Sequence, residues 1–194
     1  MRMFVAVRPP TDAVEHLDEF LEPRREAGAF RWSPADQLHL TLAFLADVPD
    51  RAVDDLHERL ERAARRRTAF ATRLHGGGAF PHAARARVLW AGLDLDERGL
   101  EELRRLATGA RAAAAKAGVA VDGQRFRPHL TVARLGHPLE ASSWVRLLDT
   151  YTGPAWRVEE VELVASHLGE GPRKRPRHEV VATFPLSRPA ESSK

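Results

Sequence analysis

Two short stretches of the sequence place a histidine two positions before a threonine. Residues 39–45 read HLTLAFL and residues 129–135 read HLTVARL. Five of the seven positions are identical, and the stretches lie 90 residues apart. A match of this kind within one chain is the signature of an internal duplication. We therefore predict two halves that each carry one copy of the motif.

Each copy presents an imidazole and a hydroxyl group to one surface if it forms a β-strand. Residues i and i+2 point to the same face of a strand, so His39 projects with Thr41, and His129 projects with Thr131. If the halves pack with pseudo-two-fold symmetry, the four groups line one cleft. A neutral imidazole can accept a proton from water, an imidazolium can protonate a leaving oxygen, and hydroxyls can bind phosphate oxygens. This set favours phosphodiester hydrolysis.

Arg134 is the candidate for neutralising the charge of the phosphate, because a guanidinium group can make a forked contact with it. Its distance of five positions from His129 puts it on the opposite face of a flat strand. The prediction therefore requires a β-bulge, a twist or a strand end between the two residues. With imidazoles for proton transfer and hydroxyl and guanidinium groups for charge, the proposed chemistry needs no metal or other cofactor.

Two other interpretations of the motif compete with this one. A single His-x-Thr pair is more often structural, with its imidazole satisfied by backbone partners, but the repeat weighs against that interpretation. Two histidines on separate strands can also bind zinc. The chain has no third ligand at a motif spacing, no His-Glu-x-x-His sequence and no cysteine.

Strands and helices alternate along the chain in a way that can position these residues. Apolar patterning and turn residues predict the following elements. Strands are expected within residues 4–7, 38–45, 70–74, 88–95, 129–135, 158–164 and 180–184, and helices after Thr11, after Pro49, over 97–118 and over 142–148. The glycine run at 76–78 is expected to end a strand in a turn. This order predicts a mixed α/β (α+β) fold with antiparallel strand pairs.

The paired His-hydrophobic-Thr-hydrophobic tetrapeptides resemble the two-histidine (2H) phosphoesterase superfamily. The closer similarity is to its LigT-like branch, the RNA 2',3'-cyclic phosphodiesterases, historically called 2'-5' RNA ligases. The similarity covers nearly the whole chain. It is carried by residues 3–7, 37–42, 78–81, 87–93, 126–134 and 166–168.

The resemblance implies a bilobal fold, with two pseudo-symmetric lobes of antiparallel sheet around a central cleft. It implies hydrolysis of a terminal RNA 2',3'-cyclic phosphate to a 2'-phosphate without a metal. By this analogy His39 is the proton donor to the departing 3' oxygen, and His129 is the proton acceptor that activates water. Thr41, Thr131 and Arg134 would bind the phosphate. The older name implies the reverse chemistry, a 2'-5' ligation with an RNA 5' hydroxyl in place of water.

The length and composition of the chain indicate its domain organisation and its location in the cell. With 194 residues, we expect one bilobal domain over 1–187 and a frayed tail over 188–194. The 30 basic residues, 27 of them arginine, face 27 acidic ones, so the net charge of +3 does not by itself indicate RNA binding. No apolar run reaches 18 residues, and the N-terminus lacks the features of a signal peptide. We expect a cytoplasmic monomer that acts on RNA ends or nucleotides with a 2',3'-cyclic phosphate.

The chain departs from the LigT-like pattern near its C-terminus. Residues 171–178 are strongly basic, and His178 lies in the region where relatives often carry a tyrosine. This segment is expected to form a loop that either grips an RNA backbone or is simply solvated. Trp32, Phe44 and Phe126 are expected in the core rather than stacked on a base. The alternatives to the RNA activity are action on another cyclic or 2'-5'-linked nucleotide, and a non-catalytic RNA-binding module.

Overall fold

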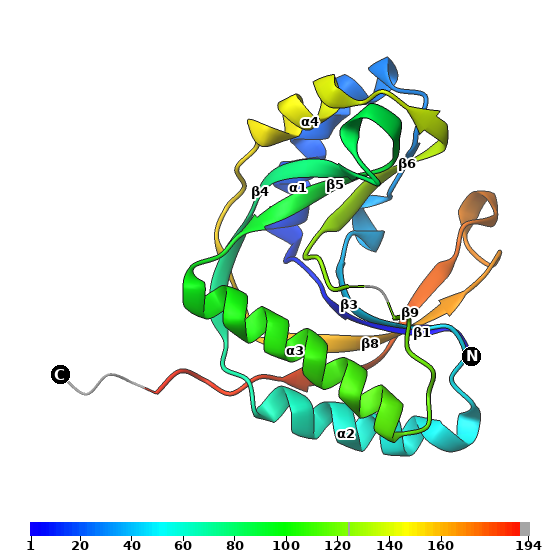
Figure 1. Cartoon of the computed structure of the whole chain (residues 1–194), viewed down its shortest axis with the longest axis vertical. Helices are drawn as coiled ribbons and strands as arrows, with labels where there is room; N and C mark the ends of the chain where they lie inside the picture. The colour runs from blue at the N-terminus through cyan, green and yellow to red at the C-terminus, as the bar shows by residue number, and fades with distance from the viewer. Residues whose placement is uncertain (124, 191–194) are drawn as a thin grey trace.

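A nine-stranded antiparallel sheet organises the molecule (Figure 1). The structure is a computed structural model that describes residues 1–123 and 125–190. The strands are β1 (Met3–Val7), β2 (Arg31–Trp32), β3 (Leu40–Leu45), β4 (Phe70–Phe80), β5 (Ala86–Asp94), β6 (Leu130–Leu139), β7 (Trp156–Val158), β8 (Glu160–His167) and β9 (Arg177–Pro185). The α-helices are α1 (Thr11–Leu21), α2 (Val53–Arg65), α3 (Glu97–Lys116) and α4 (Ser142–Asp149).

The two motif strands are neighbours at the centre of this sheet. The strand order is β7-β4-β5-β6-β3-β1-β8-β9, with β2 paired to β6 off this path, and the named strands pair antiparallel. Strands β3 and β6 meet through one registered pair, Leu40 opposite Leu130. These leucines occupy the same position of the repeated motif. The pseudo-two-fold axis therefore passes between them, and the expected antiparallel halves lie on either side.

Two helices cover each half of the sheet, and the helices cross over between the halves. Helices α2 and α3 pack together beside β3 and β9, whereas α4 packs on β4, with α1 on the same side of the molecule (Figure 1). Helix α3 follows β5 in the chain but packs on the other half, which contains β3. Helix α1 follows β1 of that half and lies on the side of the half that contains β5. Among the described residues, no helix is long and apolar enough to cross a membrane.

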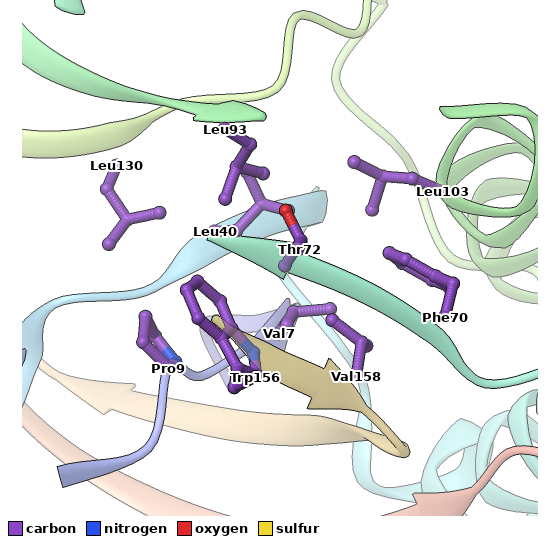
Figure 2. Close-up of a pocket in the computed structure, with 10 residues that line it drawn as sticks. All are labelled: Val7, Pro9, Leu40, Phe70, Thr72, Leu93, Leu103, Leu130, Trp156 and Val158. Carbon is purple, nitrogen blue, oxygen red and sulfur yellow. The ribbon is translucent and has the colours of Figure 1, made fainter. Parts of the chain in front are cut away.

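A small apolar cavity of about 10 Å³ lies where the halves meet (Figure 2). It is lined by Val7, Pro9, Leu40, Phe70, Thr72, Leu93, Leu103, Leu130, Trp156 and Val158. The leucines of the two motifs both reach this cavity from their own strand, and both are almost completely buried. Since side chains alternate along a strand, the residues flanking each leucine point away from the cavity, to the other face of the sheet.

The glycine run does not end a strand, contrary to our prediction. Strand β4 continues through it to Phe80, with a register shift between Leu74 and Gly77. A side chain on Gly78 would place its Cβ 2.3 Å from the indole ring of Trp90, and one on Gly77 would meet the Trp90 carbonyl oxygen at 2.5 Å. The glycines are therefore needed for the close approach of β4 to Trp90 on β5, a reason that local turn propensity does not reveal.

The predicted helix starts are partly confirmed. Asp96 is the N-cap of α3, where its Oδ1 accepts a hydrogen bond from the Gly99 backbone N–H at 2.6 Å. Thr11, after which the first helix was expected to begin, is instead the first helical residue, and Pro10 holds the N-cap position without a side-chain bond. The short strands β2 and β7 were not predicted, because two or three residues carry too little alternation to be recognised.

Candidate active site

The structure places both His-x-Thr pairs on one face of the sheet. His39 and His129 each stand one residue before their strand, and Thr41 and Thr131 are the second residues of β3 and β6. The antiparallel pairing at the central leucines puts the flanking residues of both strands on the face away from the cavity. All four are partly exposed, whereas both leucines are buried. The two pairs therefore share one face of the sheet, on either side of the central leucines.

Arg134 reaches the same face as Thr131 because β6 contains a β-bulge. Thr131 lies opposite Trp90 of β5, but Ala133 lies opposite the adjacent Leu89, so Val132 is the extra residue of the bulge. Alternation resumes after the bulge in the opposite phase, which turns Arg134 toward the motif side chains. Its charge lowers the pKa of both His39 and His129, as expected for a guanidinium group near both rings.

The first motif contains a bulge at the equivalent position. Thr41 lies opposite Ala6 of β1, and Ala43 lies opposite the adjacent Val5, so Leu42 is the extra residue there. Phe44 consequently occupies the place that Arg134 has in the other half. The guanidinium carbon of Arg2 lies 4.6 Å from the centre of the Phe44 ring, so a cation is present on this side as well, stacked on an aromatic face.

The two imidazoles are held by the same hydrogen bond. His39 Nδ1 lies 2.7 Å from the carbonyl oxygen of Gln37, and His129 Nδ1 lies 2.6 Å from that of Arg127. A carbonyl oxygen only accepts, so Nδ1 carries the proton in both rings. In the neutral form, Nε2 of each ring therefore has a free lone pair. This tautomer suits a group that exchanges protons through Nε2.

Aromatic side chains enclose both rings. The ring of His39 stacks on Phe4, with centroids 4.5 Å apart, and meets the edge of His178 at 5.6 Å. Burial, opposed by the Gln37 hydrogen bond and assisted by nearby positive groups, lowers the pKa of His39 to about 4. The ring of His129 lies 4.8 Å from Phe80, and burial lowers its pKa as well. Both imidazoles are therefore neutral at pH 7 in the ligand-free protein.

His178 belongs to this site although the sequence suggested no role for it. It lies on β9 opposite Ser166, and its ring contacts Phe4 at 5.0 Å as well as His39. It stands 139 residues after His39 and has no motif of its own. Only the pairing of β1, β8 and β9 brings the two rings together. Trp32 and Phe126 are partly buried against the main core, whereas Phe44 packs on a small separate cluster on the face of the site.

The lowered pKa of His39 makes the stability of the protein pH-dependent. The unfolded chain takes up a proton near pH 6.5 and the folded protein near pH 4, so acidification between these values favours unfolding. The contribution is complete above pH 6.5 and lost by pH 4, and it amounts to about 3 kcal/mol. In urea titrations at pH 7.5 and 4.5, we expect wild type to lose about 2–3 kcal/mol more than His39→Gln.

His137→Gln is the matched control for this measurement, because His137 is exposed on β6. Its pH dependence should follow that of the wild type. Equal losses in wild type and His39→Gln would contradict the lowered pKa.

Paired antiparallel halves with a His-x-Thr dyad from each, arranged about a pseudo-two-fold axis, define a two-histidine phosphoesterase. The chain belongs to the 2'-5' RNA ligase superfamily, whose sequence profile matches residues 9–170. This result agrees with the resemblance that the motifs indicated.

Individual relatives match over most of this chain. An RNA 2',3'-cyclic phosphodiesterase of Thermus thermophilus is 33% identical over 192 residues, which cover 96% of this chain and 90% of the relative. One of Geobacillus stearothermophilus is 30% identical over 187 residues. That match covers 94% of this chain but only 56% of the length of the Geobacillus protein.

Solved structures share the whole fold. The crystal structure of TT0787 from Thermus thermophilus superposes with a TM-score of 0.76 at 32% identity, covering 96% of this chain and 98% of that one. Escherichia coli LigT complexed with 3'-AMP superposes with a TM-score of 0.75 at 28% identity and the same coverage. The predicted α+β fold with antiparallel halves is confirmed.

Proposed function

We propose that this protein hydrolyses the terminal 2',3'-cyclic phosphate of RNA to a 2'-phosphate. The observation that carries the proposal is the pair of equivalent imidazoles, each with Nδ1–H bound to a backbone carbonyl and each beside a threonine hydroxyl. Family membership and the activity in the names of two relatives support this choice of substrate. Residues 1–187 act as one bilobal unit in this proposal.

In the proposed reaction, one histidine accepts a proton and the other donates one, on opposite sides of the phosphorus atom. Nε2 of His129 accepts a proton from water while the water oxygen forms its bond to phosphorus. His39 gives its proton to the 3' oxygen as the bond between that oxygen and phosphorus breaks, which leaves the phosphate on the 2' oxygen. Each proton transfer contributes about 10²–10⁴-fold to the rate.

The non-bridging phosphate oxygens are bound by the hydroxyls of Thr41 and Thr131 and by the guanidinium group of Arg134. Because His39 is neutral at pH 7 without ligand, its role as proton donor requires the negative charge of the bound phosphate to raise its pKa. An RNA 5' hydroxyl in the place of water would attack the same phosphorus and form a 2'-5' linkage. Ligation is therefore not the reverse of this hydrolysis, as the older name first suggested, but the same attack with a different nucleophile.

Hydrolysis in the presence of a chelator tests this function. We expect the protein to convert adenosine 2',3'-cyclic phosphate to adenosine 2'-phosphate at the same rate with and without excess EDTA, because imidazole, hydroxyl and guanidinium groups supply all the chemistry. Product identity is read by chromatography against the 2'- and 3'-phosphates.

Three outcomes would contradict the proposal. They are no product, activity that depends on an added metal ion, or a strong preference for cyclic ADP-ribose phosphate over both an RNA end and a mononucleotide. RNA binding without turnover would favour a non-catalytic module instead.

A further inference from the structure

The hairpin between β8 and β9 ends in a cluster of cations that the proposed mechanism does not use. Arg173, Lys174 and Arg175 follow one another at its tip. Within the part of the chain that the structure describes, none of their side chains has an ion pair or a hydrogen bond. Arg177, at the start of β9, bonds instead to Glu170 and Glu179. The three tip cations are therefore available to a ligand, and Arg177 is not.

The backbone at this tip is held in a conformation that its residues do not favour. Arg173 has a φ of 55° and Lys174 a φ of 59°, in the left-handed region where glycine is common. Every other residue with positive φ in the described ranges is a glycine. The turn is closed by backbone bonds from Gly171 N–H to the Arg175 carbonyl and from Arg175 N–H to the Pro172 carbonyl. Two cations thus stand in a strained turn, as residues at binding sites often do.

The same hairpin is attached to the catalytic end of β3. The side-chain amide of Gln37 donates a hydrogen bond to the Pro176 carbonyl at 2.9 Å, and Gln37 is also the residue whose carbonyl holds His39. His178 contacts the His39 ring. Since Arg175 precedes His178 by three residues, the Cα atoms of these two residues lie within about 11 Å of each other. Figure 1 shows the hairpin, in orange, standing clear of α2 and α3.

We infer that the hairpin tip, residues 173–175, is a binding site for the RNA backbone just 5' of the terminal cyclic phosphate. The inference rests on the proposed function for the nature of the substrate. Attack in line puts water on the His129 side of the phosphorus and the 3' oxygen, with its ribose, on the His39 side. The strand continues from that ribose, so its next phosphates pass the element packed against His39. Arginine and lysine side chains neutralise such phosphates, and arginine does so with two parallel hydrogen bonds.

A second basic surface does not fit this role. The groove between α2 and α3 has a volume of about 680 Å³ and is lined by seven cations. Four of them pair with carboxylates: Arg59 with Asp55, Arg62 with Glu58, Arg67 with Glu102, and Arg105 with Glu101. These helices pack on the buried side of β3, away from the face that carries the motif histidines. The groove is therefore a matched control surface.

The test compares a long and a short substrate of the same chemistry. The substrates are a hexa-adenylate ending in a 2',3'-cyclic phosphate and adenosine 2',3'-cyclic phosphate. In the triple variant Arg173→Gly, Lys174→Gly, Arg175→Gln, the ratio of kcat/KM for the hexamer to that for the mononucleotide should fall at least about tenfold. Glycine accepts positive φ, so the turn is kept. The slope of log kcat/KM for the hexamer against log salt should become shallower by about 2.

Two control variants isolate the tip. Arg173→Lys with Lys174→Arg keeps the charge and should hold the ratio within about threefold of wild type, because phosphate attraction depends mainly on charge. Arg62→Gln, Arg66→Gln, Arg104→Gln removes three charges from the α2–α3 groove and should leave the ratio unchanged. An unchanged ratio in the tip variant, or an equal fall in the groove variant, overturns the inference.

A binding measurement separates this inference from the proposed function. Fluorescence anisotropy with a labelled hexa-adenylate ending in a 2'-phosphate needs no turnover. The tip variant should bind it at least about tenfold more weakly than wild type, even if neither protein hydrolyses a cyclic phosphate. Equal affinities would overturn the tip as a backbone site, whereas tight binding without hydrolysis would count against the proposed function alone.

Discussion

Replacing either His39 or His129 by alanine is expected to lower kcat for 2',3'-cyclic phosphate hydrolysis by about 10²–10⁴-fold. In the proposed mechanism, each variant removes one of the two proton transfers and leaves the proposed phosphate-binding groups in place. The loss should therefore fall on kcat more than on KM, as it does for an interaction that acts mainly in the transition state. Initial rates on adenosine 2',3'-cyclic phosphate at saturating and subsaturating concentrations measure both parameters.

The double variant provides a sharper check on the shared role of the two histidines. Groups that act as a unit in one step lose most of their effect when either is removed. His39→Ala, His129→Ala should therefore be little slower than the worse single variant. The control is His137→Ala, because His137 is exposed and outside the site. Its rate should stay within about twofold of wild type, and near-normal turnover by either motif variant would refute the two-histidine mechanism.

The second large effect is expected on stability, at the seam between the halves. Leu40 is 2% exposed and Leu130 is 0% exposed, and both line the small cavity between the halves. Truncating either to alanine enlarges that cavity, and such changes cost about 2–5 kcal/mol. This is a large share of the roughly 5–15 kcal/mol that stabilises a typical domain. Urea denaturation followed by circular dichroism measures the loss.

The two leucine variants should lose similar amounts, because the residues occupy equivalent positions of the repeat. Each should unfold in one cooperative transition if residues 1–187 form a single unit. Val181→Ala is the control, since Val181 on β9 is 43% exposed and its truncation should cost less than about 0.5 kcal/mol. If Leu130→Ala lowers the free energy of unfolding by no more than this, the proposed role of Leu130 in packing the two halves together is contradicted.

The shared face of the motif side chains was predictable because it depends on a local rule. A histidine and a threonine two positions apart share a face on any strand, and the repeat indicated that two such strands belong together. The place of Arg134 was not predictable in the same way. Its side chain reaches the site only because Val132 is the extra residue of a bulge, and that bulge is a property of the register with β5.

Other features followed from contacts between distant segments. His178 meets His39 only because β8 lies between β1 and β9. The glycine run extends a strand because Trp90 on the neighbouring strand packs against it. Neither partner is visible from local composition. The rules for turn residues therefore singled out these glycines correctly, but they predicted a turn where the glycines instead allow close strand packing.

The two equivalent bulges have a consequence for how a substrate enters. A phosphate bound only by the symmetric parts of the site, the two imidazoles and two hydroxyls, would have two orientations of equal energy related by the axis between the halves. After the bulge, however, one half presents Arg134 and the other presents Phe44 beneath Arg2. A direct guanidinium contact on one side and an aromatic ring on the other make the two orientations unequal. The site is therefore asymmetric about this axis, and in the proposed reaction a nucleotide is expected to have one preferred direction in it.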